Sequence, residues 1–228
     1  RAPGRYLPDL LVDEARAFLD EDRADPYFLF LALPIPHFPV QPRSEHRRRY
    51  LEMKLEDPRR VLYGAYVTTL DDCVGQILEA ASARGDGERT VVLFLSDNGH
   101  SVEVRALGGG GSSGPFRGHK ETLWEGGIRV PCIAAWPGQI PAGETRQQPA
   151  MAMDWLPTLA EICQLQAPED RAIDGRSLAS LLASATASSP HERLHWAHYN
   201  GSFAVREGRW KLHSRKRDDL WLCDLHSD

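Results

Sequence analysis

Apolar residues in the N-terminal half follow two patterns, one typical of helices and one typical of buried strands. Residues 7–20 and 61–84 carry apolar side chains at steps of three and four, which predicts two amphipathic helices. Residues 27–33 and 91–95 are continuous apolar runs, as expected for strands of a parallel sheet buried on both faces. A third short strand is predicted within residues 128–136. Helices alternating with apolar strands indicate an α/β fold.

The C-terminal part of the chain changes to short strands joined by turns. Residues 152–163 and 178–182 still predict helices. Three short strands follow them, at residues 202–206, 209–213 and 220–224. We therefore expect a sheet flanked by helices in residues 1–190, and a small, incomplete antiparallel β subdomain in residues 191–228.

Composition and charge exclude few classes of function. Charged residues make up 26% of the chain and the net charge is -5, which gives no support for nucleic-acid binding. The basic run Arg47–Arg49 stands near Glu45 and Glu52, so we interpret it as the solvated face of a helix. No apolar run approaches the ~20 residues of a membrane span. No apolar core follows Arg1–Arg5, as a signal peptide would require.

The four cysteines stand far apart, at positions 73, 132, 163 and 223. None forms a Cys-x-x-Cys pair, so a structural zinc site is not expected. Two disulfides are possible, but the spacing does not demand them. Buried free thiols are the default interpretation for Cys73, Cys132 and Cys163, and the redox compartment stays open.

The apolar run 91–95 ends in Ser96-Asp97-Asn98-Gly99, which puts two hard oxygen donors after a predicted strand. Ligands bind beyond the carboxyl ends of strands in open α/β sheets, and Asp97 with Asn98 would suit calcium or magnesium. Asn-Gly is also a strong hairpin signal, with residues 100–104 as the return strand. Because the incoming run does not alternate, the pattern favours the metal site over the hairpin.

A glycine-rich loop, residues 108–114, precedes Gly118 and Lys120. A phosphate-binding loop fails on spacing, because the lysine does not directly follow the glycine and no Ser or Thr comes next. The loop would let backbone approach a ligand or bring Lys120 inward, whereas a solvated side chain is the alternative for a lone lysine. His37 follows the 27–33 run in a proline-rich loop and is similarly a site residue or an ordinary histidine.

Several segments resemble the later half of a type I sulfatase, in the same order. The most specific is the run from Arg117 to Pro131, which contains Lys120 and Trp124-Glu125-Gly126-Gly127. The other matching segments are Pro26–His37, Ser96–Gly99, Asp154–Leu159, Asp174–Leu178 and Val205–Lys211. The resemblance extends from about Asp25 onward and implies an alkaline-phosphatase-like α/β fold.

The resemblance implies roles for four residues. Asp97 and Asn98 match the family's later pair of metal ligands, usually for calcium, with magnesium as the alternative. Lys120 matches the lysine that contacts the sulfate, and His37 matches the histidine near the ester oxygen. A cation and a lysine stabilise charge on sulfate oxygens, and a histidine donor assists departure of the alcohol. His100 and His119 receive no role.

One family feature has no counterpart in the sequence. Type I sulfatases carry an early Cys/Ser-x-Pro-Ser/Ala-Arg motif, whose first residue is oxidised to formylglycine, the nucleophile. None of the four cysteines has this context, and the early metal-binding aspartates have no match. The resemblance therefore implies the C-terminal half of a sulfatase, inactive alone, with formylglycine and the rest of the metal shell in a missing N-terminal half.

We expect the complete enzyme to hydrolyse aryl or carbohydrate sulfate esters. One alternative is a phosphodiesterase or phosphonate monoester hydrolase of the same superfamily, which often has Asp-His where this chain has Asp97-Asn98. Another is a non-catalytic remnant or interaction module, whose exposed apolar edges would favour self-association. By family resemblance, the compartment would be periplasmic, extracellular or lysosome-like.

Overall fold

The computed structural model describes residues 4–106, 108–215 and 219–227. The first three residues of the Arg1–Arg5 stretch therefore lie outside the described residues. Contacts divide the chain into two compact units, each described here by itself. Unit 1 comprises Arg1–Gly87 and Asp97–Val130, and unit 2 comprises Glu88–Ser96 and Pro131–Asp228. The expected domain boundary between residues 190 and 191 stays a prediction.

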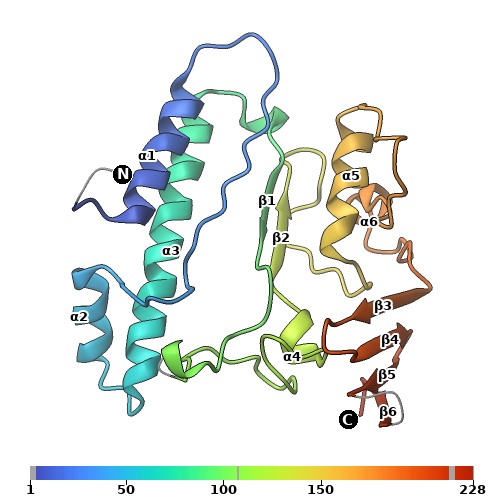
Figure 1. Ribbon diagram of the computed structural model, residues 1–228. Coiled ribbons are helices and arrows are strands. Elements are labelled where there is room, and N and C mark those ends of the chain that lie inside the picture. Colours follow the sequence, from blue (N-terminus) through green and yellow to red (C-terminus); the bar gives the residue numbers. More distant parts are fainter. Residues whose placement is uncertain (1–3, 107, 216–218, 228) are drawn as a thin grey trace. The chain divides into compact units, whose positions relative to one another are not determined.

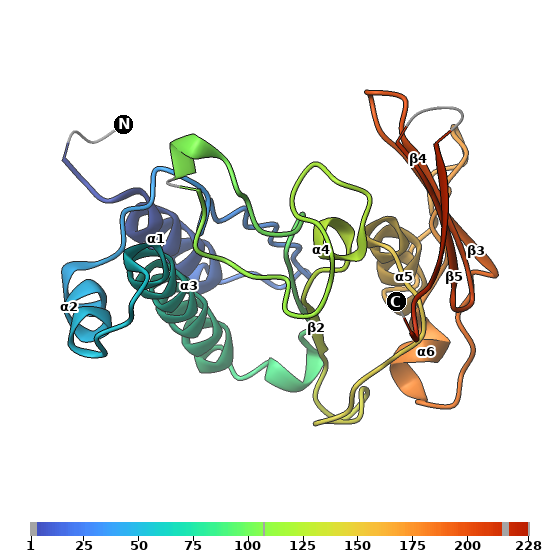
Figure 2. The ribbon, with the colours of Figure 1, turned by 90° about the horizontal axis from the view of Figure 1, so that it is seen from below.

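Two long helices form the frame of unit 1. Helix α1 (Leu7–Asp20) packs along α3 (Pro58–Ala83), and α2 (Ser44–Glu52) packs on α3 near its start (Figures 1 and 2). Helix α1 has the predicted bounds. Helix α3 begins earlier than predicted because Asp57 caps it, accepting a 2.9 Å bond from the Arg59 backbone N–H, with Pro58 in the first turn.

Residues 27–33 do not form the predicted strand. They are extended, but among the described residues no strand pairs with them. Burial alternates along the segment: Leu29, Leu31 and Leu33 are half-buried, whereas Phe28 and Phe30 are 72% and 79% exposed. The continuous apolar run led us to expect burial on both faces, and the described residues cover only one.

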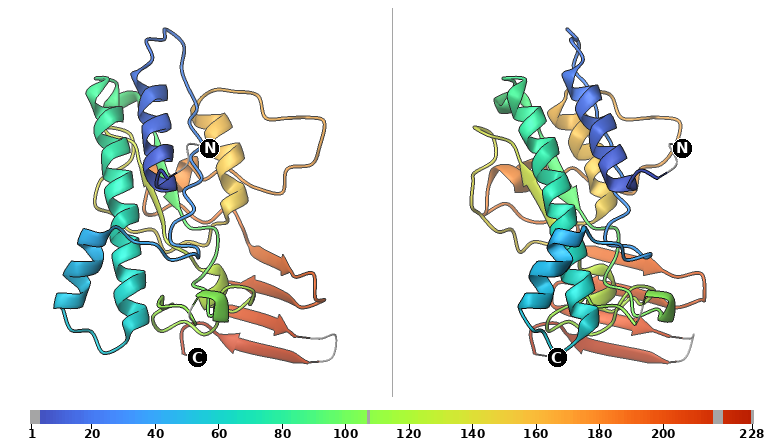
Figure 3. Two further views of the ribbon diagram at one scale, coloured as in Figure 1. Left: turned by 60° about the vertical axis from the view of Figure 1, so that its left-hand side comes forward. Right: turned by 90° about the vertical axis from the view of Figure 1, so that its left-hand side faces the viewer.

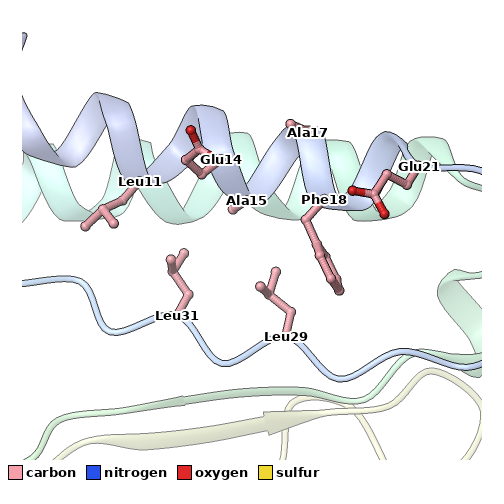
Figure 4. Close-up of a pocket in the computed structure, with 8 residues that line it drawn as sticks. All are labelled: Leu11, Glu14, Ala15, Ala17, Phe18, Glu21, Leu29 and Leu31. Atoms are coloured by element: carbon pink, nitrogen blue, oxygen red, sulfur yellow. The ribbon is translucent and has the colours of Figure 1, made fainter. Parts of the chain in front are cut away.

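The covered face of residues 27–33 packs against the helices of unit 1. Leu33 and Ile35 join Val12 of α1 with Tyr66 and Cys73 of α3 in the hydrophobic core. Earlier in the segment, Leu29 and Leu31 point toward α1 across a cavity of about 340 Å³ (Figure 4). This end of the segment is therefore packed less closely than the end that enters the core.

The remainder of unit 1 is mostly irregular. The chain from Asp97 to Val130 contains only two short helical turns among its described residues, η2 (Val104–Ala106) and α4 (Glu125–Ile128). Residues 123–127 are buried, whereas most of the glycine-rich loop is not. Arg47–Arg49 are exposed on α2, which confirms their interpretation as a solvated helix face.

A two-stranded sheet opens unit 2. After η1 (Gly87–Arg89), strand β1 (Val92–Leu95) pairs with β2 (Cys132–Ala135), with Val92 opposite Ala135. Both strands were predicted; residues 91–95 were expected in a parallel sheet, but the described strand that pairs with them runs antiparallel. Strand β2 is mostly exposed, with Ile133 61% exposed, whereas most of β1 is half-buried.

A buried carboxylate ties together the helical part of unit 2, which consists of η3 (Ala152–Asp154), α5 (Trp155–Ile162) and α6 (Ala179–Ala183). Asp154 is fully buried and accepts backbone N–H bonds from Met151 at 2.7 Å and from Arg176 at 2.9 Å. The His191 Nε2 lies 2.8 Å from its Oδ1. Such pairing is what makes a buried charge tolerable. The two predicted helices are confirmed within a few residues.

Unit 2 ends in a four-stranded antiparallel sheet (Figure 3). Its strands follow chain order: β3 (Arg193–Ala197), β4 (Phe203–Glu207), β5 (Trp210–Ser214) and β6 (Leu220–Asp224). The last three were predicted. Strand β3 was missed because its run mixes charged and apolar residues, of which only Leu194 is buried.

The thiols differ in burial. Cys73 is buried in α3 as expected, but Cys132 on β2 and Cys163 at the end of α5 are exposed, so their expected burial is wrong. Cys163 is exposed because it caps a helix end. Among the described residues, no helix is both long and apolar enough to cross a membrane.

Candidate functional site

Asp97 and Asn98 lie in a bend after β1, and residues 100–103 form no return strand, so the hairpin alternative is wrong. The bend is held against α4. The Gly99 N–H donates to the Gly127 carbonyl at 2.9 Å. A Cβ at position 99 would lie only 1.9 Å from the Gly126 carbonyl oxygen. The glycine of Asn98-Gly99 therefore serves a close backbone approach rather than a turn.

Lys120 is attached to the segment that follows Asn98. Its backbone N–H donates to the His100 carbonyl at 2.9 Å, and its side chain is half-buried. The His119 Nδ1 lies 2.7 Å from the Lys120 carbonyl oxygen. Just before it, Gly118 has φ +93 and no room for a side chain, since a Cβ would lie 2.6 Å from that of Trp124. These contacts hold Lys120 beside the Asp97–Asn98 bend.

The glycine-rich loop packs closely on side chains of unit 1. A Cβ at Gly111 would lie 2.7 Å from that of His100 and 3.1 Å from the Tyr63 ring. The expectation that glycines permit close approach is thus met by contacts within the protein. His100 also faces His119, with ring centroids 6.4 Å apart. Burial lowers the pKa of His100, and His119 lowers it further, so this imidazole is neutral at pH 7.

His37 lies in a tight turn at the end of the extended segment. Its N–H donates to the Pro34 carbonyl at 2.9 Å, and its Nδ1 lies 2.7 Å from the Phe38 carbonyl oxygen. The Phe38 ring stands 4.8 Å from the imidazole. The His37 side chain is exposed. The ring is oriented through Nδ1, which leaves Nε2 on the side away from its own backbone.

A turn of residues 101–106 connects the His37 loop with Lys120. The Arg105 guanidinium lies over the Phe38 ring at 4.4 Å and pairs with Glu103 at 2.6 Å. The Ser101 hydroxyl donates to the other oxygen of Glu103 at 3.1 Å. The hydrogen bond from Arg105, the bond from Ser101 and the nearby charge of Lys120 all lower the pKa of Glu103. Glu103 is therefore held as a carboxylate by Arg105 and Ser101, with the charge of Lys120 acting on it from a distance.

Three of the four predicted residues lie on two chain segments that backbone hydrogen bonds join to each other. Asp97, Asn98 and Lys120 belong to them, whereas His37 is connected through Phe38, Arg105 and Glu103. Among the described residues, no hydrogen bond or ion pair joins His37 to Asp97 or Lys120. Sequence reasoning missed Glu103 and Arg105, because a Glu-x-Arg pair in an irregular loop carries no motif; only its closeness to Asn98 could have drawn attention to it.

The donor set of Asp97 and Asn98 fits a hard cation in part. The Asp97 side chain is exposed and has no hydrogen-bond or ion-pair partner within the described chain. The Asn98 Nδ2 donates to the Gly99 carbonyl at 2.8 Å. Calcium takes six to eight oxygen ligands, so two residues supply only a fraction of a shell. The described residues include no group of three or more His, Cys, Asp or Glu side chains placed to hold a metal ion.

Two hollows of unit 1 lie away from these residues. Each has a volume of about 340 Å³. The first is lined by α1 and by Leu29 and Leu31, and the second by residues around Tyr6 and Arg43. Neither is lined by His37, Asp97, Asn98 or Lys120. Neither of these two hollows is therefore the candidate site.

Comparisons with known proteins agree with the order of these motifs. The family model described as "Sulfatase" matches residues 2–165, and that described as "N-sulphoglucosamine sulphohydrolase, C-terminal" matches residues 114–228. Steryl-sulfatase of Mus musculus is 38% identical over 88% of the chain, and N-acetylgalactosamine-6-sulfatase of the same species 36% over 94%. The chain spans 31% and 40% of the length of these two relatives.

Solved structures give the same picture for the fold. The crystal structure of Ps i-CgsB in complex with k-i-k-neocarrahexaose superposes with a TM-score of 0.88 at 28% identity, covering 98% of this chain and 49% of that one. A phosphonate monoester hydrolase of Agrobacterium radiobacter gives 0.56 at 21% identity, covering 74% of this chain and 35% of that one. The likeness confirms the alkaline-phosphatase-like α/β fold, of which the chain holds a part.

Proposed function

Because the chain belongs to the sulfatase family, we propose that it supplies the sulfate-binding side of an enzyme that hydrolyses sulfate esters. The observation that carries this proposal is the 2.9 Å bond between the Lys120 N–H and the His100 carbonyl, which keeps Lys120 beside Asp97 and Asn98. A lysine whose backbone is bonded two residues beyond Asn98 can bring its ammonium to an oxyanion that is also bound by a cation at Asp97 and Asn98. Because the chain spans about a third of its curated relatives, the activity belongs to the complete protein.

Lys120 would bind the sulfate directly. Its backbone is fixed by the bond to His100 and by the contact with His119, which sets where its flexible side chain starts. The half-buried position strengthens its attraction for an anion relative to a fully solvated lysine.

His37 would donate a proton to the departing alcohol oxygen. Its Nδ1 faces the Phe38 carbonyl, so Nδ1 carries the hydrogen in the neutral ring. Protonation at Nε2 then gives an imidazolium that can act as a general acid toward an alcohol. Exposure of the side chain leaves this nitrogen accessible to substrate.

Asp97 and Asn98 would hold part of the shell of a calcium ion, with magnesium as the alternative. Both offer hard oxygen donors, and the Asp97 carboxylate is not engaged by other described residues. A bound cation of this kind stabilises negative charge on sulfate oxygens. Asparagine rather than histidine at position 98 supports a hard cation over zinc, and hence a sulfate ester over a phosphoester.

Formylglycine, the nucleophile typical of the family, has no precursor motif in this chain. The proposal therefore predicts turnover of 4-nitrophenyl sulfate by the complete protein in the presence of calcium, and none by the 228-residue chain alone. Product release followed by absorbance, with metal content measured in parallel, tests both halves of the statement.

Two results would contradict the proposal. Multiple turnover by the 228-residue chain would show that the chemistry does not need the family's formylglycine motif. Hydrolysis of phenyl phosphonate esters with stoichiometric zinc, together with no release from sulfate esters by the complete protein, would favour the phosphonate hydrolase alternative.

A further inference from the structure

The turn formed by residues 101–106 is held by its own hydrogen bonds and by a contact with the His37 loop. Glu103 receives hydrogen bonds from Ser101 and Arg105 and lies close to the charge of Lys120. Arg105 reaches the other way and covers the Phe38 ring, next to His37. The turn therefore bridges the residue proposed to bind sulfate and the loop proposed to protonate the leaving alcohol.

The same anchors turn two valines outward. Ala106 is buried, and its N–H donates to the Glu103 carbonyl at 2.9 Å, which closes the turn. Between the anchored positions, Val102 is 43% exposed and Val104 is 91% exposed. A single exposed valine is ordinary on a protein surface. Here two exposed valines lie on one turn, which follows His100, the residue bonded to the Lys120 backbone, and which contacts the His37 loop through Arg105.

We propose that Val102 and Val104 form an apolar rim that contacts the alcohol part of the substrate and favours aryl or other hydrocarbon alcohols over sugars. The inference rests on the proposed function of the site. An apolar ring against valine methyl groups loses only unfavourable hydration, whereas sugar hydroxyls there lose water without gaining a hydrogen bond. The charged groups of the turn cannot compensate, because Glu103 and Arg105 already bind each other.

The test compares two substrates in the complete protein. kcat/KM is measured for 4-nitrophenyl sulfate and for a monosaccharide 6-O-sulfate, in wild type, Val104→Ser and Val67→Ser. Val67 is an exposed valine on α3, away from the turn, and serves as the matched control. Differences in the intrinsic reactivity of the two esters cancel, because only the change in their ratio between variants is read.

Val104→Ser should lower the aryl-to-sugar ratio about fivefold, and the double variant with Val102→Ser about tenfold, the scale of discrimination that one hydrophobic group gives. Val67→Ser should leave the ratio unchanged. An unchanged ratio in an active Val104→Ser protein would overturn the rim and leave the proposed function intact. A complete wild-type protein that releases neither alcohol would overturn the proposed function and the rim with it.

Discussion

At the scale of single residues, glycines rather than charged groups decide where the candidate ligands stand. Gly99 lets the bend that carries Asp97 and Asn98 touch the backbone of α4. Its backbone needs no left-handed conformation, so the requirement is for space alone. The dipeptide Asn98-Gly99 suits a hairpin turn and also a close approach of two backbone segments. The sequence alone does not separate the two, because the segment that faces Gly99 is known only from the fold.

Gly99→Ala should therefore destabilise the chain by ~3 kcal/mol or more, because its Cβ would overlap the Gly126 carbonyl and force the bend away from α4. Gly75→Ala is the matched control. Gly75 lies within α3 with nothing within 4 Å of the added methyl, so alanine should stabilise by up to about 1 kcal/mol. Urea denaturation of both variants measures the difference. Equal stability of Gly99→Ala and wild type would contradict the close approach.

At the scale of elements, the helices could be predicted from the sequence and the sheet only in part. The bounds of α1 follow from its apolar spacing, because α1 buries one stripe against α3. The sequence of residues 27–33 contains no comparable spacing from which its structure could be predicted. Whether an apolar run becomes a strand depends on neighbours on both edges, and the described residues provide none for it. The antiparallel pairing of β1 with β2 likewise depends on partners and not on either strand's own sequence.

The exposed face of residues 27–33 should govern association of the isolated chain. Phe28→Ser and Phe30→Ser remove apolar surface that is already in water, so they should reduce self-association without lowering stability. Leu29→Ser and Leu31→Ser alter the face toward α1 and should cost about 1 kcal/mol each. Light scattering and urea denaturation separate the two effects. Loss of stability in the phenylalanine variants would mean that this face is covered in solution.

At the scale of the whole molecule, the motifs identified the family and the fold, but not how the candidate site is held together. Asp97, Asn98, Lys120 and His37 were singled out by their place in the sequence pattern and then by resemblance, and their roles stay predictions. The link from His37 to Lys120 through Phe38, Arg105 and Glu103 could not be predicted, because it joins side chains far apart in the sequence. Such long-range pairing follows from the fold and leaves no periodic or motif signal.

The central claim is that Lys120 and Asp97 bind the sulfate and its cation in the complete protein, and variant kinetics test it most directly. Lys120→Ala and Asp97→Ala should each lower kcat/KM for 4-nitrophenyl sulfate by at least about 100-fold, the effect of losing one charge-stabilising group. Asp170→Ala, which removes only an exposed pair with Arg171, should match wild type. If Lys120→Ala kept wild-type kcat/KM in a folded protein, this site would not be where the sulfate binds.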